Sequence, residues 1–220
     1  MTDADPALVP FASAVATRRG DDGTTGLLFG GDRIAKDDLR TEAYGTIDEA
    51  VAALGVARAW LGVKDRVGTL NVGFGDLPDI LLRIQRELFV VAAELATQPG
   101  AWDRQQDDVT RVSAAMVEGL EGMLREAEAH IVMPTEFVVP GETPVSAAME
   151  LARTILRRAE RRAVTLGAAG LIPGPHLLPY LNRLADLVWV LARAAEQAEA
   201  RSAPPSRPDR RRPAAPRSDR

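Results

Sequence analysis

The chain is 220 residues long and carries 27 basic and 31 acidic side chains, 46% apolar residues, 5% aromatic residues and no cysteine. A chain of this length can bury a core of its own, and the absence of cysteine excludes thiol nucleophiles, disulfides and thiolate metal sites. The two histidines, His130 and His176, lie far apart, no apolar run approaches the roughly 20 residues that span a bilayer, and the N-terminus is acidic. We therefore expect a cytoplasmic protein without a histidine metal site or a membrane span.

The first sixteen residues have no clear pattern, and we expect them to be flexible. Residues 17–36, called the N-terminal loop below, are polar and contain five glycines, which predicts an ordered loop or a short hairpin. Five segments with helical periodicity follow, separated by proline or glycine. They span residues 43–63, 77–97, 106–131, 144–168 and 177–200. The predicted fold is an all-α bundle of five helices over residues 17–200, with ferritin-like antiparallel up-down packing.

The fourth helical segment carries the densest charge of the chain. Five arginines lie within ten residues, accompanied by the single acid Glu160. They are Arg153, Arg157, Arg158, Arg161 and Arg162. Arg153, Arg157 and Arg161 recur every four residues and form an arginine face opposite an apolar stripe. Because like charges at this spacing repel, the face requires an anion, either a polyphosphate gripped by guanidinium forks or the carboxylates of a neighbouring subunit.

The N-terminal loop is a second candidate site. Its glycines at 20 and 23 and the hydroxyls of Thr24 and Thr25 could bring backbone amides close to a phosphate, with Lys36 as a point charge. The spacing matches neither a P-loop nor a dinucleotide fingerprint. An ordinary turn is the alternative interpretation.

Polar residues also interrupt two of the helical segments. Asp48 and Glu49 lie near the start of the first segment, where acids favour the helix dipole. Asn182, Arg183 and Asp186 interrupt the apolar stripe of the fifth segment, and Asn182 could be an ordinary surface amide. None of these residues decides a function alone.

The last twenty residues, RSAPPSRPDRRRPAAPRSDR, combine seven arginines with five prolines. Such a segment has little to bury, so we expect residues 201–220 to be disordered. The rest of the chain is net negative, which argues against nucleic acid as a partner.

Five segments together resemble a known enzyme family. TRRGDDGTTGLLFGG, KDDLRTEAYGTIDEAVAALGVAR, LLRIQRELFVVAAELA, FVVPGETPVSAAMELARTILRRAERR and YLNRLADLVWVLAR resemble, in order and spacing, ATP:cob(I)alamin adenosyltransferases of the propanediol-utilisation type. The resemblance covers residues 17–195. It implies a five-helix bundle, a homotrimer with ATP bound between subunits, and attack of the Co(I) of cobalamin on the 5' carbon of ATP, which gives adenosylcobalamin and triphosphate.

The resemblance also assigns residues to the site. It implies that the nucleotide is cradled by a set in the N-terminal loop: Thr17, Arg18, Arg19, Gly20, Thr25 and Lys36. It implies that the ATP site is completed across the interface by Arg157, Arg158, Glu160, Arg161 and Asn182. Arg153 would pair with Asp48 beside the corrin, and Phe137 would exclude the lower axial ligand of cobalt, which makes Co(II) easier to reduce. Mg2+ would accompany ATP, with ligands that the sequence does not fix.

The chain departs from the family pattern at a few positions, which keeps a second function open. Glu142 adds a negative charge after Phe137, Leu39 stands where proline is usual, and Arg18 and Arg19 replace a lysine and a small polar residue. The alternative is a non-catalytic paralogue that binds ATP or cobalamin as a chaperone or sensor. A polyanion-binding scaffold is a third hypothesis. For the enzyme, a reductase and an adenosylcobalamin-dependent enzyme are expected partners.

Overall fold

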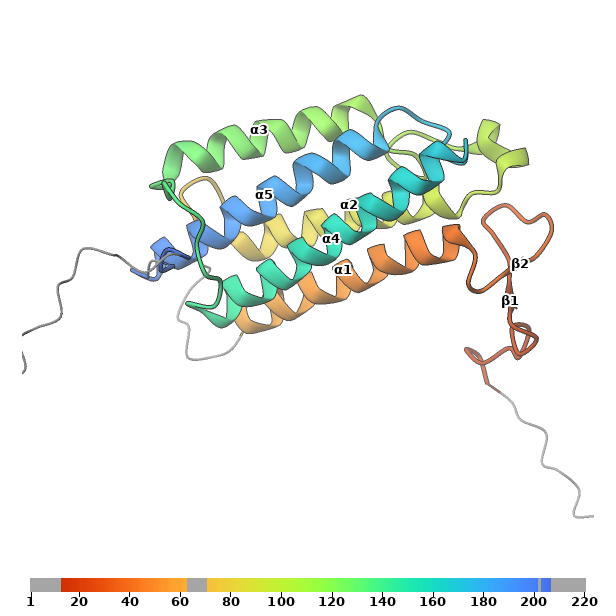
Figure 1. Cartoon of the computed structure of the whole chain (residues 1–220), viewed down its shortest axis with the longest axis horizontal. Helices are drawn as coiled ribbons and strands as arrows, with labels where there is room; N and C mark the ends of the chain where they lie inside the picture. Colours follow the sequence, from red (N-terminus) through yellow and green to blue (C-terminus); the bar gives the residue numbers. More distant parts are fainter. Residues whose placement is uncertain (1–12, 63–70, 202, 207–220) are drawn as a thin grey trace, which may run out of the picture.

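The computed structural model describes residues 13–62, 71–201 and 203–206 and shows an elongated bundle of α-helices (Figure 1). The helices are α1 (Leu39–Leu61), α2 (Leu77–Ala96), α3 (Ala114–His130), α4 (Pro144–Ala168) and α5 (Leu177–Ala198). A 3-10 helix, η1 (Pro99–Arg104), and a two-stranded antiparallel sheet of β1 (Thr24–Thr25) and β2 (Ile34–Ala35) complete the described elements. Helices that follow one another in the chain run in opposite directions (Figure 1). The predicted all-α five-helix bundle is therefore confirmed, and the N-terminal loop is a short hairpin.

The start of α4 follows the local chemistry of its sequence. Thr143 is the N-cap and accepts the backbone N–H of Ser146 at 3.0 Å, while the Ser146 hydroxyl accepts the Thr143 N–H at 3.2 Å. Pro144 occupies the first turn, where its missing N–H costs no hydrogen bond. This reciprocal capping fixes the register of α4 and hence the direction of its arginines.

The predicted start of the first helix was wrong by four residues. The Asp38 carboxylate caps the N–H of Arg40 at 2.9 Å, so α1 begins at Leu39 rather than at residue 43. Asp48 and Glu49 consequently lie in the middle of α1, where the dipole of a helix N-terminus does not account for them.

The predicted start of the third helix was also wrong, by eight residues. Ser113 caps α3 by accepting the N–H of Met116 at 3.2 Å. Residues 106–112 form a turn instead, in which the Arg111 guanidinium binds Asp107 at 2.7 Å. A serine that binds a nearby backbone amide begins a helix more readily than it continues one.

Small side chains let α1 and α4 pack closely. Both helices turn alanines inward, and all of those listed next are buried: Ala43, Ala50, Ala53, Ala57, Ala152, Ala159 and Ala163. Helices approach more closely where the contacting side chains are small. The leucines of α5 fill the centre of the bundle between α3 and α4. As a result, the outward face of α4 lies directly beside the outward face of α1.

Part of the predicted disordered tail is ordered. Residues 203–206, the C-terminal strap below, lie against residues 134–140, the pocket loop below: Val139 donates its N–H to the Pro204 carbonyl at 2.8 Å, and Ser206 donates to the Phe137 carbonyl at 2.6 Å. These contacts involve residues assigned to the tail, and the boundary at residue 201 stays a prediction. Residues 1–12 and 207–220 lie outside the described part. Among the described helices, none is both long and apolar enough to cross a membrane.

Candidate active site

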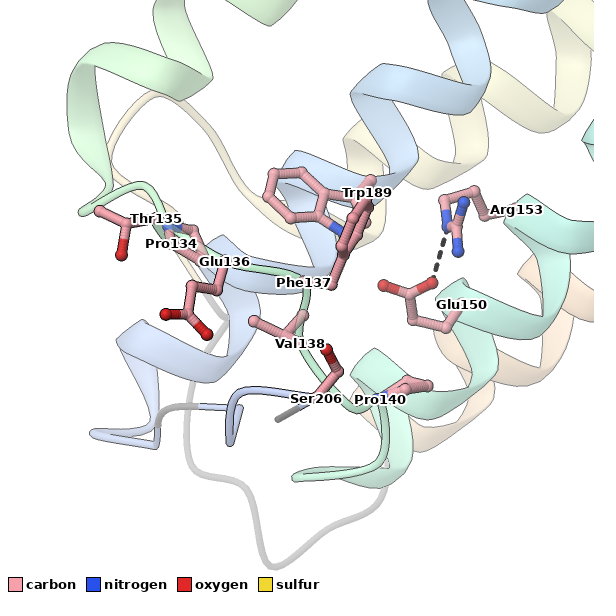
Figure 2. A pocket seen from close by; sticks show the side chains of 10 residues that line it. All are labelled: Pro134, Thr135, Glu136, Phe137, Val138, Pro140, Glu150, Arg153, Trp189 and Ser206. Carbon is pink, nitrogen blue, oxygen red and sulfur yellow. Dashed lines mark hydrogen bonds and ion pairs between the residues drawn. The ribbon is translucent and has the colours of Figure 1, made fainter. Parts of the chain in front are cut away.

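A cavity of about 650 Å³ opens between the pocket loop and the first half of α4. Figure 2 shows Arg153 and Glu150 of α4 across from the pocket loop and Trp189 of α5. Phe137 lines the cavity although 87% of its surface is exposed. Phe137 therefore offers an apolar aromatic surface to whatever molecule occupies the cavity.

Arg153 lines this cavity and is held by a carboxylate of its own helix. Its Nε donates to Glu150 Oε2 at 2.7 Å, one turn earlier on α4. Within this single chain Arg153 contacts Glu150 and not Asp48. The pairing of Arg153 with Asp48 that the resemblance implies therefore stays a prediction. Asp48 lies exposed on α1, and partial desolvation raises its pKa above the ordinary value.

The remaining arginines of α4 divide into two groups. Arg158 forms an ion pair with Glu49 of α1, and Arg162 lies 3.5 Å from Glu42, also on α1. Arg161 donates to the backbone carbonyl of Arg157 at 3.1 Å. Within the described residues, neither Arg157 nor Arg161 has a carboxylate partner. On the arginine face, Arg153 is therefore paired with a carboxylate, whereas Arg157 and Arg161, one and two turns later, meet none among the described residues.

Glu160 and Asn182 are brought together from two helices. Asn182 Nδ2 on α5 donates to Glu160 Oε1 on α4 at 3.1 Å, and Asn182 Oδ1 accepts from Arg183 Nη1 at 2.6 Å. Arg183 is held in turn by Glu121 of α3 at 3.2 Å. This chain of contacts places Asn182 beside the arginine-bearing helix, and the shared role of Asn182 and Glu160 in one site stays a prediction.

The N-terminal loop is ordered by contacts within itself. Lys36 Nζ donates to the Gly20 carbonyl at 2.7 Å, and Arg33 donates to the Arg19 carbonyl at 2.7 Å and to the Thr24 hydroxyl at 2.6 Å. A Cβ at position 20 would lie 2.9 Å from the flexible Lys36 Nζ and 3.1 Å from the Thr24 carbonyl oxygen, so a larger residue would require Lys36 to move. Arg33 was missed by the sequence analysis, although a cation between the two strands of a hairpin is a recognisable signal.

The other loop residues of the predicted site are less constrained. Thr17, Arg18 and Arg19 are exposed before the hairpin, and Arg18 adopts a positive φ of 59°. Thr25 pairs with Ile34 in the two-stranded sheet. Their role in binding a nucleotide stays a prediction.

The sequence analysis also missed a buried ion-pair network beside the cavity, formed by Arg193, Glu196 and Glu150. Arg193 donates to both carboxylate oxygens of Glu196 at 2.8 Å and to Glu150 Oε1 at 3.1 Å. Each of the three side chains is at least nine-tenths buried. The signal was an arginine followed three residues later by a glutamate inside the apolar run LVWVLARAAEQA, because a buried charge requires such partners.

The polar residues that were expected to interrupt α5 are less buried than this network. Asn182 and Arg183 are half-buried, and Asp186 is exposed. Glu142 is half-buried beside the N-cap of α4 and is not among the residues lining the cavity. Among the described residues, no group of three acidic or histidine side chains is arranged to hold a metal ion.

Comparisons with known proteins identify the family of this chain. The family described as cobalamin adenosyltransferase matches residues 15–195. The chain belongs to this family. A corrinoid adenosyltransferase of Citrobacter freundii is 37% identical over 182 residues, covering 83% of this chain and 94% of that protein. One from Mycobacterium tuberculosis is 40% identical over 184 residues, covering 82% of this chain and 88% of the relative.

Solved structures of the same enzyme type share the fold. A variant of the PduO-type ATP:corrinoid adenosyltransferase from Lactobacillus reuteri, complexed with cobalamin and ATP, superposes with a TM-score of 0.74 at 28% identity. The match covers 87% of this chain and 98% of that one. A second variant of the Lactobacillus reuteri enzyme, complexed with ATP, gives a TM-score of 0.73 at 27% identity.

Proposed function

We propose that this chain is a corrinoid adenosyltransferase that moves the 5'-deoxyadenosyl group of ATP to the Co(I) of cobalamin. The cobalt–carbon bond forms as the bond between the 5' carbon and its oxygen breaks, and triphosphate leaves with the electron pair of that bond. Besides family membership, one structural observation supports the proposal. A cavity with an exposed aromatic wall lies at one end of a row of arginines whose next two members meet no carboxylate among the residues that the structure describes.

The cavity is the proposed corrin site. Phe137 and Trp189 offer apolar faces to the ring, and Arg153 offers guanidinium donors at its edge. Phe137 would take the place of a lower axial ligand of cobalt. Without that donor, Co(II) is reduced to Co(I) at a higher potential, which cellular reductants reach more easily.

Arg157 and Arg161 are proposed to hold the triphosphate. They lie one helical turn, about 6 Å, apart on one face, so their forks can grip successive phosphates. Charge develops on the triphosphate as the carbon–oxygen bond breaks, and fixed cations stabilise it without reorganisation. Arg158, Glu160 and Asn182 would line the same nucleotide. No general base is required, because no proton is removed from the reacting carbon.

A homotrimer would complete the ATP site, with the N-terminal loop of one subunit facing the arginine face of the next. The loop supports this arrangement because its cations, such as Lys36, are held by its own backbone and stand exposed at the end of the bundle. Mg2+ would be bound mainly by phosphate oxygens and water, because no group of three acidic or histidine side chains among the described residues is arranged to hold a metal ion. A cytoplasmic location, a reductase and an adenosylcobalamin-dependent enzyme complete the proposal.

The test is product formation. The protein, ATP, Mg2+ and chemically reduced cobalamin are expected to give light-sensitive adenosylcobalamin and one triphosphate per product. Equal product in a protein-free control would contradict the proposal. Tight binding of ATP or cobalamin without turnover would select the non-catalytic paralogue instead.

A further inference from the structure

We infer that Glu150 is a positioning residue that neutralises Arg153 and orients it toward the corrin. As a result, the Arg153 end of the arginine face would bind the neutral edge of the corrin, and the Arg157 end would bind the anionic triphosphate. The inference rests on the proposed function. It concerns an acid that neither the resemblance nor the comparisons assign to the site. It is supported by the contacts of Glu150, by the burial of Arg193 and Glu196, and by the lack of a carboxylate partner for Arg157 among the described residues.

Both oxygens of Glu150 are engaged. Oε2 accepts from Arg153 Nε at 2.7 Å, and Oε1 accepts from Arg193 Nη1 at 3.1 Å (Figure 2 shows the first of these contacts). Two guanidinium groups on opposite sides leave the carboxylate one orientation. Arg153 is held through Nε, so its two Nη groups stay available to the cavity that the side chain lines.

Glu196 anchors the network from behind. It binds Arg193 through both oxygens at 2.8 Å, and both side chains are about 1% exposed. The Arg193 guanidinium also lies 5.6 Å from the centre of the Trp189 ring, which lines the same cavity. The network therefore supports two cavity walls at once, one on α4 and one on α5.

The charges within the network of Glu150, Arg153, Arg193 and Glu196 cancel, and Glu136 is a further acid that lines the cavity. Two arginines, Arg153 and Arg193, meet two glutamates, Glu150 and Glu196, whereas Arg157 and Arg161 meet no carboxylate within the described residues. A neutralised guanidinium still donates hydrogen bonds to amide oxygens, such as those at the edge of a corrin ring, but it attracts a polyphosphate less strongly. The sequence of charges along α4 thus favours corrin at Arg153 and triphosphate at Arg157.

The experiment compares the affinities of Glu150→Gln for two substrates. Cob(II)alamin is titrated in the presence of ATP and followed by absorbance, and ATP alone is titrated by calorimetry. We expect cob(II)alamin affinity to fall about tenfold, the usual effect of losing one charge-assisted hydrogen bond, while ATP affinity changes less than about twofold. Glu94→Gln is the matched control, since Glu94 is a buried acid on α2 outside the cavity, and it is expected to leave both affinities unchanged.

A double-mutant cycle separates positioning from general structural damage. In an Arg153→Gln background, Glu150→Gln is expected to cost less than about twofold in cob(II)alamin affinity, because its effect passes through Arg153. An equal loss for both substrates, or an undiminished loss without Arg153, would overturn the inference. If Glu150→Gln does not fold, Glu150→Asp keeps the charge beside Arg193 but shortens the reach to Arg153, and the same selective loss is required of it. Wild-type protein that forms no product would refute the proposed function instead.

Discussion

The two parts of the arginine face on α4 show how charge pairing separates structural support from ligand binding. Arg153 forms an ion pair with Glu150, and Glu150 forms a second one with the buried Arg193. Arg157 and Arg161 have no carboxylate partner among the described residues. Both parts lie on one helix and repeat at one spacing, so the sequence makes them look alike. The difference comes from an acid one turn earlier and from a partner on α5.

The largest expected effect on the reaction rate comes from replacing Arg157, which has no carboxylate partner among the described residues. Arg157→Ala is expected to lower the rate of adenosylcobalamin formation by about 10²-fold, because a fixed cation is lost where triphosphate charge develops. The circular dichroism spectrum is expected to stay unchanged, since Arg157 is exposed. Arg162→Ala is the matched control on the same helix, with a surface ion pair to Glu42 and an expected change below about threefold. A near-normal rate for Arg157→Ala would remove the distinction between the two parts.

Two truncated chains test the contribution of the C-terminal strap to the proposed corrin site. A chain ending at residue 201 loses the C-terminal strap and with it the two backbone hydrogen bonds to Phe137 and Val139. We expect its cob(II)alamin affinity to fall about fivefold, because the pocket loop is then less ordered. A chain ending at Ser206 keeps the strap and removes only the rest of the arginine-rich tail. An equal loss in both truncated chains would assign the effect to the tail and not to the strap.

Arg158 combines features of both parts of the arginine face. The family resemblance assigns it to the ATP site, but in this chain it forms an ion pair with Glu49. Glu49→Gln is expected to improve ATP affinity about twofold by removing a competing carboxylate, and to change the free energy of unfolding by less than about 1 kcal/mol, since both side chains are largely exposed. Calorimetric titration and urea unfolding measure these two quantities. Glu42→Gln provides the comparison, and a matching gain in ATP affinity there would point to bulk charge.

Glu94 is a buried acid with no guanidinium hydrogen bond among the described residues, and the charge of Arg111 only partly offsets the effect of burial on its pKa. Its Oε2 accepts the Val112 N–H at 2.7 Å, its Oε1 has no hydrogen-bond partner among the described residues, and burial raises its pKa above the ordinary 4.5. A carboxyl group whose pKa is raised on folding ionises first in the unfolded chain, so its contribution to stability falls as pH rises through that window.

The variant Glu94→Gln removes this titration. Its free energy of unfolding relative to wild type is expected to increase as the pH rises from about 4 to 7, which urea unfolding at several pH values measures. A difference independent of pH would show that the folded protein does not shift the Glu94 pKa.

Local rules predicted the parts of the fold that local chemistry decides. The Thr143–Pro144 start of α4 followed from capping alone, and the five helices followed from apolar periodicity. The starts of α1 and α3 were missed because other polar residues near Asp38 and Ser113 offered alternative starts, and only the structure shows which side chain caps the helix. Boundaries of this kind depend on which of several polar side chains reaches a backbone amide.

The site was predicted unevenly for a related reason. The arginine face follows from spacing on one helix, but its division depends on Glu150 meeting Arg193 across two helices. The C-terminal strap was missed because its composition is that of a disordered segment, and only pairing with the pocket loop orders it. Contacts between distant segments left no periodic pattern in either case.

The claim that unpaired arginines bind the triphosphate is tested most directly by titrating inorganic triphosphate into the protein without cobalamin. The account predicts that wild type and Arg162→Ala bind with similar affinity, and that the double variant Arg157→Ala, Arg161→Ala binds at least tenfold more weakly. Equal binding by wild type and the double variant, or an equal loss in Arg162→Ala, would contradict it.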